Sequence, residues 1–134
     1  MIERKYRALV VEDDPALRML TIRELSHRGF DCDPACDGLQ ARELVASRYY
    51  DVVVTDLRMP EVNGHRLAVE LLTRENRPAV VILTGVTEPK ITKDLIARGV
   101  DDIIFKPVDQ GFLAAKVLAL IERRAPLLAA NEPV

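Results

Sequence analysis

The segment Asp51-Val52-Val53-Val54-Thr55, directly followed by Asp56, decides the fold of this chain. A near-continuous run of β-branched residues is typical of a strand that other elements cover on both faces. Residues 56–64 follow as a loop rich in turn-forming residues, and a helical pattern and another apolar run come next. The same order of apolar run and amphipathic stretch recurs on both sides of this segment.

Short apolar runs alternate with amphipathic stretches along the whole chain. The expected strands are residues 6–11, 30–35, 51–55, 79–83 and 100–105. The expected helices are residues 15–28, 38–47, 65–75, 88–98 and 110–124. Asp14-Pro15 favours a helix start, because the carboxylate caps free amides and proline suits the first helical position. Asp37 can likewise cap the helix that runs to about residue 47. This alternation predicts an α/β fold with a parallel sheet and helices on both faces.

Length and composition exclude several classes of protein. A chain of 134 residues is expected to form one domain, and 49% hydrophobic with 30% charged residues excludes disorder, collagen and coiled coil. The balance of 19 basic and 21 acidic residues argues against a general nucleic-acid-binding surface. No apolar run approaches the ~18 residues of a membrane span. The apolar run near the start is too short for a signal peptide, so we expect a cytoplasmic protein.

The cysteines and histidines do not form a recognisable site. On one extended segment, the α-carbons of Cys32 and Cys36 would lie about 13 Å apart, which is beyond the reach of a disulfide. We therefore expect two small, partly buried strand residues. His27 and His65 are distant from each other in the sequence and belong to no motif with metal-ligand spacing.

Polar residues follow four of the five expected strands. They are Glu12, Asp13 and Asp14 after the first strand, Asp56 after the third, Thr84 after the fourth and Lys106 after the fifth. In a doubly wound sheet these ends share one rim, where ligands of such folds bind. Two carboxylates about 4 Å apart repel by about 4 kcal/mol at an effective dielectric of 20, so the group needs cations. Oxygen ligands suit Mg²⁺, and Mg²⁺ with a carboxylate, a hydroxyl and an ammonium suits phosphoryl transfer.

Each of these residues also has a purely structural interpretation. Asp14 is most simply the helix cap, Glu12 and Asp13 could be exposed turn acids, and Asp56 could cap its loop. Thr84 and Lys106 could be ordinary surface residues at strand ends. Taken together they favour a site, because all of them fall at carboxyl strand ends. Three other acids near strand starts are expected to be solvated: Asp51, Asp101 and Asp102.

These motifs resemble a response-regulator receiver domain of the chemotaxis-regulator type. The matching pieces are residues 9–15, 53–60, 62–64, 81–85 and 99–107, and the match spans residues 5–124. The resemblance implies a flavodoxin-like, doubly wound sheet with the strand order 2-1-3-4-5. Residues 125–134 remain as a C-terminal tail or as the start of a linker to an absent output domain.

The resemblance also implies roles for the residues at the strand ends. Asp56 resembles the phospho-accepting aspartate, Thr84 the switch hydroxyl, and Lys106 the lysine that pairs with the phosphoryl group. Asp13 resembles a direct Mg²⁺ ligand with Glu12 beside it, and Asp56 and the backbone carbonyl of Arg58 complete the set. The Lys106-Pro107 bond is expected to be cis. No organic cofactor is implied.

The chain departs from the family pattern at the position three residues before the lysine. Ile103 stands there, where the family usually has a tyrosine or phenylalanine that reports the switch. Switching is then expected to use another residue or to be weakly coupled. Gly85 replaces the commoner alanine after Thr84, which should leave the phosphoryl group accessible.

The leading hypothesis is a phospho-receiver in two-component or phosphorelay signalling. A sensor histidine kinase or a histidine phosphotransfer protein would donate the phosphoryl group to Asp56. The face of the fourth helix, fifth strand and fifth helix would then switch and act on an output protein or a fused output domain. The chain would be no enzyme beyond its own phosphorylation and dephosphorylation, and it would not itself contact nucleic acid or membrane.

One alternative is a docking module that never carries phosphate. Another is a Mg²⁺-dependent phosphohydrolase, which Arg58 disfavours because such enzymes usually have an aspartate at that place.

Overall fold

The computed structural model describes the backbone of residues 6–58, 63–85 and 89–130, and the side chains as far as residue 124. Its strands are β1 (Tyr6–Val11), β2 (Phe30–Ala35), β3 (Val52–Asp56), β4 (Ala79–Thr84) and β5 (Asp102–Phe105). Its helices are α1 (Pro15–His27), α2 (Gly38–Ser47), α3 (Gly64–Leu72), α4 (Pro89–Ala97) and α5 (Gln110–Ala130). Strands and helices alternate from end to end, as the sequence predicts.

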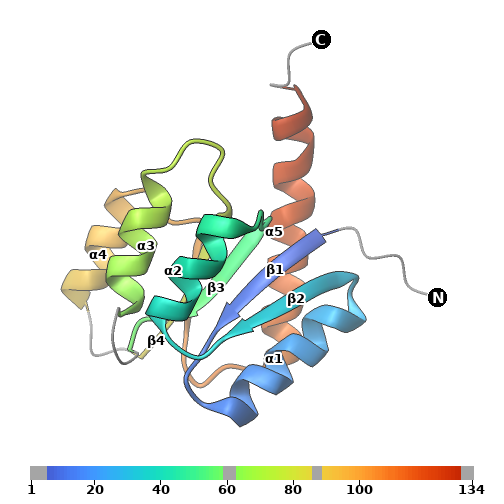
Figure 1. Ribbon diagram of the computed structural model, residues 1–134, viewed down its shortest axis with the longest axis vertical. Helices are drawn as coiled ribbons and strands as arrows, with labels where there is room; N and C mark the ends of the chain where they lie inside the picture. The colour runs from blue at the N-terminus through green and yellow to red at the C-terminus, as the bar shows by residue number, and fades with distance from the viewer. Residues whose placement is uncertain (1–5, 59–62, 86–88, 131–134) are drawn as a thin grey trace.

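The five strands form one parallel sheet in the order β2-β1-β3-β4-β5. The order reverses between β1 and β3, since the chain first adds β2 on one side of β1 and then grows on the other side. Figure 1 shows the sheet with helices on both of its faces. This confirms the predicted α/β fold with its flavodoxin-like, doubly wound topology.

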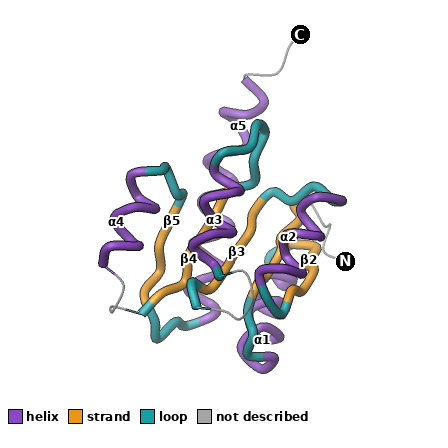
Figure 2. The backbone as a smooth tube through the Cα atoms, turned by 60° about the vertical axis from the view of Figure 1, so that its left-hand side comes forward, coloured by secondary structure: helices purple, strands orange, loops and turns teal. Residues whose placement is uncertain are grey.

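Two apolar clusters, one on each face of the sheet, hold the helices in place. Leu25 of α1 and Leu113 of α5 pack on one face with Val52 and Val54 of β3. On the other face, helices α2, α3 and α4 pack over Val53 and its neighbours. Figure 2 shows these three helices side by side in front of the strands. Because alternate side chains of β3 enter opposite clusters, the strand needs apolar residues at nearly every position.

Both helix caps that the sequence predicts most clearly are present. The Asp14 side chain accepts hydrogen bonds from the amides of Ala16 and Leu17 at the start of α1. Asp37 accepts one from the amide of Gln40 at the start of α2. These bonds satisfy amides that have no partner inside the helix, and they fix where each helix begins.

Two helices end at other places than the pattern predicts. Helix α3 ends at Leu72 instead of residue 75, where the amide of the cap residue Thr73 bonds to the carbonyl of Leu71, and Asn76 takes a positive φ of 53° in the turn that follows. Helix α5 continues past residue 124 and through Pro126 to Ala130. Proline removes only one helical hydrogen bond here, and the leucines and alanines that follow are strong helix formers. The expected tail therefore begins as helix.

The acids near the strand starts are not solvated as expected. Asp51 accepts a hydrogen bond of 2.7 Å from the amide of Arg7, and Asp101 accepts one of 2.8 Å from the amide of Val80. Asp101 also forms an ion pair of 2.8 Å with Arg77. Amides at strand starts lack ladder partners, so these carboxylates supply the missing acceptors. Asp102 binds the amide of Ile103 in the same way.

The two cysteines are free and differ in environment. Cys32 is half-buried on β2, as predicted. Cys36 lies just beyond the end of that strand and is exposed, so the expectation of two partly buried strand residues is wrong for this one. The chain turns toward α2 at this point, where the amide of Cys36 binds the side chain of Gln40.

Within the described residues, none of the helices combines the length and the apolar character that a membrane span requires.

The Tyr50 side chain ties the start of β3 to β2. Its ring is 2% exposed, and its hydroxyl donates a hydrogen bond of 2.6 Å to Asp33. Burial would raise the pKa of Asp33, but the hydrogen bonds from Tyr50 and Arg48 outweigh it and lower the pKa. Burial and the same hydrogen bond raise the pKa of Tyr50 to about 12.

Replacing Tyr50 with Phe should lower the free energy of unfolding by about 1–2 kcal/mol, because a hydrogen bond to a charged acceptor is lost. The folded state depresses the pKa of Asp33, so this stabilisation is present above the unfolded value of about 4 and is lost as pH falls through the lower folded value. Urea unfolding at pH 7 and pH 3 measures both effects. Tyr49→Phe is the control and should change stability much less, since the Tyr49 ring is 56% exposed and its hydroxyl contact is 3.3 Å. Equal losses for both variants would contradict the assignment.

Candidate functional site

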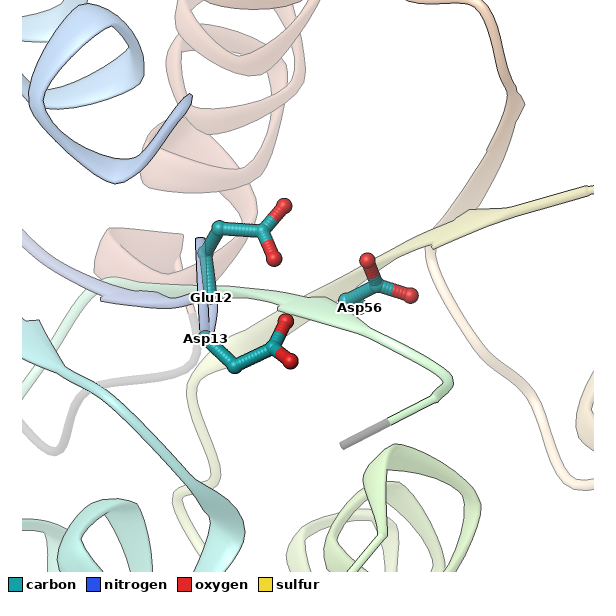
Figure 3. Close-up of side chains that lie close together, drawn as sticks. All are labelled: Glu12, Asp13 and Asp56. Carbon is teal, nitrogen blue, oxygen red and sulfur yellow. The ribbon is translucent and has the colours of Figure 1, made fainter. Parts of the chain in front are cut away.

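Three carboxylates converge where β1 and β3 end. Glu12 and Asp13 follow β1, and Asp56 is the last residue of β3. Each offers an oxygen, and these oxygens lie within 4.8 Å of one another. Figure 3 shows the three side chains reaching into the same space from two strand ends. Glu12 and Asp56 are buried and Asp13 is exposed, so the group opens to solvent on one side. We refer to Glu12, Asp13 and Asp56 as the acidic trio.

The trio is electrostatically unfavourable by itself. The pKa of Glu12 is raised to about 7, first by burial, then by its hydrogen bond with Asp13 and by the charge of Asp56. The amide of Asp14 and the charge of Lys106 act in the opposite direction and offset only part of this rise. The charged form of Glu12 is therefore less favourable than that of a free glutamate, and a nearby cation would favour it.

Lys106 supplies positive charge from the end of β5. Its ammonium forms an ion pair with Asp56 and lies 4.0 Å from Glu12. Burial would lower the pKa of this lysine. The hydrogen bond to Asp56 and the charge of Asp56, followed by the charges of Glu12 and Asp13, outweigh burial and raise the pKa. The Lys106-Pro107 peptide bond is cis, as expected. Lys106 is also tied to β4, because its amide donates to the carbonyl of Thr84 at 2.8 Å.

Thr84 lies at the end of β4, between the strands that carry Asp56 and Lys106. Its side chain is buried, and the hydroxyl donates a hydrogen bond of 3.0 Å to the carbonyl of Gly85. Thr84, Gly85, Lys106 and the trio line one open cleft of about 580 Å³. The structure thus brings the predicted hydroxyl, ammonium and carboxylates to one place.

Hydrogen bonds from backbone amides fix the first two residues of the loop after Asp56. The amide of Arg58 donates to Asp56 Oδ1 at 3.1 Å, and the amide of Leu57 donates to the carbonyl of Leu83 at 3.1 Å. Arg58 also lines the cleft, so its backbone is close to the trio. The role of its carbonyl as a metal ligand stays a prediction. Residues 59–62, which include part of the matched loop, lie outside the described residues.

Gly64 returns the chain to the end of β3. Its amide donates to the carbonyl of Leu57 at 2.9 Å, which closes the loop at the first residue of α3. A β-carbon at this position would lie 1.9 Å from the carbonyl oxygen of Asp56. Only glycine permits this close approach, and the contact sets the distance between α3 and the trio.

Two further residues lie where the sequence predicts, and each has a clear structural role. Asp14 caps α1 and is exposed, so its interpretation as a cap is confirmed. Ile103 is half-buried on β5 and packs against the apolar cluster under α2, α3 and α4, to which Leu95 of α4 belongs. At this position the chain therefore has an aliphatic side chain in the apolar layer to which α4 also contributes.

The acidic trio fits a hard divalent cation. Its ligand atoms are all carboxylate oxygens, two of the three groups are held by burial at strand ends, and the third is open to solvent. Oxygen-only donor sets of this kind suit Mg²⁺, which keeps several of its own waters. The raised pKa of Glu12, caused first by burial and then by Asp13 and Asp56, shows that its charged form is disfavoured without further positive charge nearby.

One contact at this site has no counterpart in the sequence prediction. The Arg18 guanidinium donates a hydrogen bond of 2.7 Å to the backbone carbonyl of Glu12. The sequence shows an arginine in the first helix, but nothing in the periodicity indicates that it reaches back to the strand end. A basic residue one turn inside a helix that follows an acidic pair is the only available signal, and it is weak.

Comparison with known proteins agrees with this geometry. The family model for the response regulator receiver domain matches residues 8–118. Response regulator ArlR of Staphylococcus aureus is 31% identical over 119 residues, which are 87% of this chain and 52% of that protein. The chain therefore spans about half the length of the curated relatives it matches.

Solved structures of receiver domains superimpose closely. The receiver domain of the Francisella response regulator 1452 has a TM-score of 0.81 and 28% identity, over 90% of this chain and 99% of that one. The signal receiver domain of a signal transduction histidine kinase from Syntrophus aciditrophicus has a TM-score of 0.80 and 26% identity, over 88% and 91% of the two chains. This chain belongs to the response regulator receiver domain family, whose members act in two-component signalling.

Replacing Gly64 with Ala should lower the free energy of unfolding by about 1–3 kcal/mol or more, because the new β-carbon must push α3 away from Asp56. Gly111→Ala is the matched control. Its β-carbon would meet side-chain oxygens and no backbone atom, with Asp109 Oδ1 at 3.1 Å and Glu24 Oε2 at 3.9 Å, and alanine is favoured in a helix. Thermal and urea unfolding of both variants compare the two positions. A Gly64 variant as stable as the wild type would show that α3 does not depend on this close approach.

Proposed function

We propose that Asp56 is the phosphoryl acceptor of this receiver domain. The observation that carries the proposal is the position of its carboxylate, which pairs with Lys106 and shares the cleft with two further acids and the Thr84 hydroxyl. The carboxylate is buried at its strand end but lines the open cleft, so an attacking oxygen is held in place and remains reachable. Positioning and charge neutralisation are the main needs of phosphoryl transfer.

The reaction forms a bond between an Asp56 oxygen and phosphorus as the bond from phosphorus to a donor imidazole nitrogen breaks. The imidazole nitrogen keeps the electron pair and takes up a proton. We propose that Glu12, Asp13, Asp56 and the carbonyl of Arg58 hold Mg²⁺, which supplies neutralisation of charge on the phosphoryl oxygens. The Arg58 amide donates to Asp56 Oδ1, which helps keep the carboxylate oriented.

Lys106 and Thr84 are proposed to respond to the added charge of about −2. Lys106 can turn from the Asp56 carboxylate to the phosphoryl group, since both lie at the same strand end. The Thr84 hydroxyl must give up its bond to the carbonyl of Gly85 to do the same. Both residues precede connections to the helices beside β5, so their movement would alter the face formed by α4, β5 and α5.

Ile103 is the proposed switch position on that face. Its side chain packs against the same apolar cluster as Ile91 and Leu95 of α4, with no aromatic ring to change sides. A ligand that moves a population from 1:99 to 99:1 needs about 5.5 kcal/mol of differential stabilisation. We infer that switching here is partial and follows the packing of α4 on β5.

A sensor histidine kinase or histidine phosphotransfer protein is the proposed phosphoryl donor, as two-component membership implies. An output protein, or an output domain joined through residues 125–134, is the proposed receiver of the signal. Because α5 continues as helix to Ala130, such a connection would begin as a helix. We propose that the domain works in the cytoplasm and has no catalytic activity other than its own phosphorylation and dephosphorylation.

Incubation with acetyl phosphate should add one phosphoryl group only when Mg²⁺ is present, and Asp56→Asn should abolish the addition. Intact-protein mass spectrometry measures it. Cys36→Ser, at an exposed position beyond β2, is a control that should accept the group normally. Labelling of the Asp56 variant would contradict the assignment. If the wild type gains nothing, beryllofluoride binding distinguishes a short-lived acyl phosphate from a docking module that never carries phosphate.

Replacing Asp13 with Asn should have opposite effects on stability and on metal use. Removing one of three neighbouring carboxylates relieves repulsion, so the metal-free protein should gain up to about 1 kcal/mol, limited by the exposure of this side chain. The Mg²⁺ concentration for half-maximal labelling should rise about tenfold or more, since a ligand is lost. Urea unfolding without metal and labelling against Mg²⁺ measure the two effects.

Asp14→Asn is the matched control for the Asp13 variant, because asparagine caps a helix about as well as aspartate. It should change neither the stability nor the Mg²⁺ requirement appreciably. If the two variants behave alike, the trio does not hold the cation.

A further inference from the structure

The backbone of Glu12 stands where the sheet ladder ends. Its amide still donates to the carbonyl of Ala35, the last residue of β2, at 3.0 Å. Beyond Ala35 the second strand stops, and the amide of Cys36 turns to the Gln40 side chain. No backbone amide of the described residues bonds to the carbonyl of Glu12, and a carbonyl beside a buried side chain needs a donor.

Arg18 provides that donor from the first turns of α1. One guanidinium nitrogen donates to the Glu12 carbonyl at 2.7 Å, while the Arg18 amide donates to the carbonyl of Asp14 at 2.9 Å. The Asp14 side chain caps the same helix. The turn that carries Glu12 and Asp13 is thus held at both of its ends by α1.

The other arginine of α1 shows that this contact is specific. Arg23 is exposed, and no bond between it and the β1–α1 turn is present in the described structure. Arg28, directly after α1, pairs with Glu24 of the same helix at 3.2 Å. Of these three arginines, only Arg18 bonds to the end of β1, and its side chain is half-buried there.

We propose that Arg18 is a positioning residue for the metal site. By binding the Glu12 carbonyl, it holds Glu12 and Asp13 at the spacing that a divalent cation needs, although it does not itself contact the cation. The proposal rests on the proposed function, since it assumes that the acidic trio holds Mg²⁺. A charged donor makes a stronger hydrogen bond to a carbonyl than a neutral one, which explains why an arginine suits this place.

The test compares Arg18→Met, Arg18→Lys and the matched control Arg23→Met. Calorimetric titration with Mg²⁺ should show about tenfold weaker binding for Arg18→Met, as is common when a group that supports a metal ligand is removed. Since one nitrogen makes the bond, Arg18→Lys should recover most of the affinity. Arg23→Met should bind as the wild type does, because it removes the same charge from the same helix without this contact.

Amide hydrogen exchange in the metal-free protein provides an independent readout. The amides of Asp13 and Asp14 should exchange about tenfold faster in Arg18→Met, while core amides of β3 such as Val53 keep wild-type rates. Faster exchange throughout would indicate general destabilisation and would overturn the proposal. In acetyl phosphate labelling, the Mg²⁺ requirement should rise while the rate at saturating Mg²⁺ stays within about twofold, as expected when affinity for the metal is the property affected.

Unchanged Mg²⁺ affinity in Arg18→Met, or equal weakening in Arg18→Met and Arg23→Met, overturns this proposal and leaves the proposed function standing. If the wild type itself binds no Mg²⁺, the proposed function fails instead. In that case the exchange rates of Asp13 and Asp14 still decide whether Arg18 holds the turn.

Discussion

The ion pair between Asp56 and Lys106 is the interaction on which the site depends. Asp56 is the last residue of β3 and Lys106 directly follows β5, and these strands are not neighbours, because β4 lies between them. They meet only if β3, β4 and β5 are in correct register and the chain leaves each strand at the same rim. Without this ammonium, three carboxylates would share a partly buried space, which is costly. The pair therefore links the topology of the sheet to the charge balance of the site.

The two rims of the sheet are built on different electrostatic principles. At the amino ends of the strands, acids such as Asp51 and Asp101 bind backbone amides, and Arg77 completes an ion pair. At the carboxyl ends, three carboxylates face the single ammonium of Lys106, and burial together with Asp13 and Asp56 raises the pKa of Glu12. One rim is satisfied internally, whereas the other has a set of carboxylate oxygens that a cation would complete.

Helix α1 has two roles. It covers one face of the sheet, and it contacts the turn that carries Glu12 and Asp13. Its cap residue Asp14 fixes where the helix begins, and Arg18 reaches back to the carbonyl of Glu12. Leu25 meanwhile anchors the helix in the apolar cluster. Packing on one side thus determines the position of polar atoms on the other, which is how a core far from the chemistry can set the geometry of the trio.

The sequence by itself determined the order of strands and helices, the caps at Asp14 and Asp37, and which polar residues stand at the carboxyl strand ends. These are local properties, encoded in periodicity, β-branching and capping chemistry. Only the tertiary structure decided that Asp51 and Asp101 bind amides, that Arg18 holds Glu12, and that Gly64 must touch Asp56. It also extended α5 to Ala130 and exposed Cys36. Contacts between distant segments follow from packing and strand register, and a local stretch of sequence does not specify either of them.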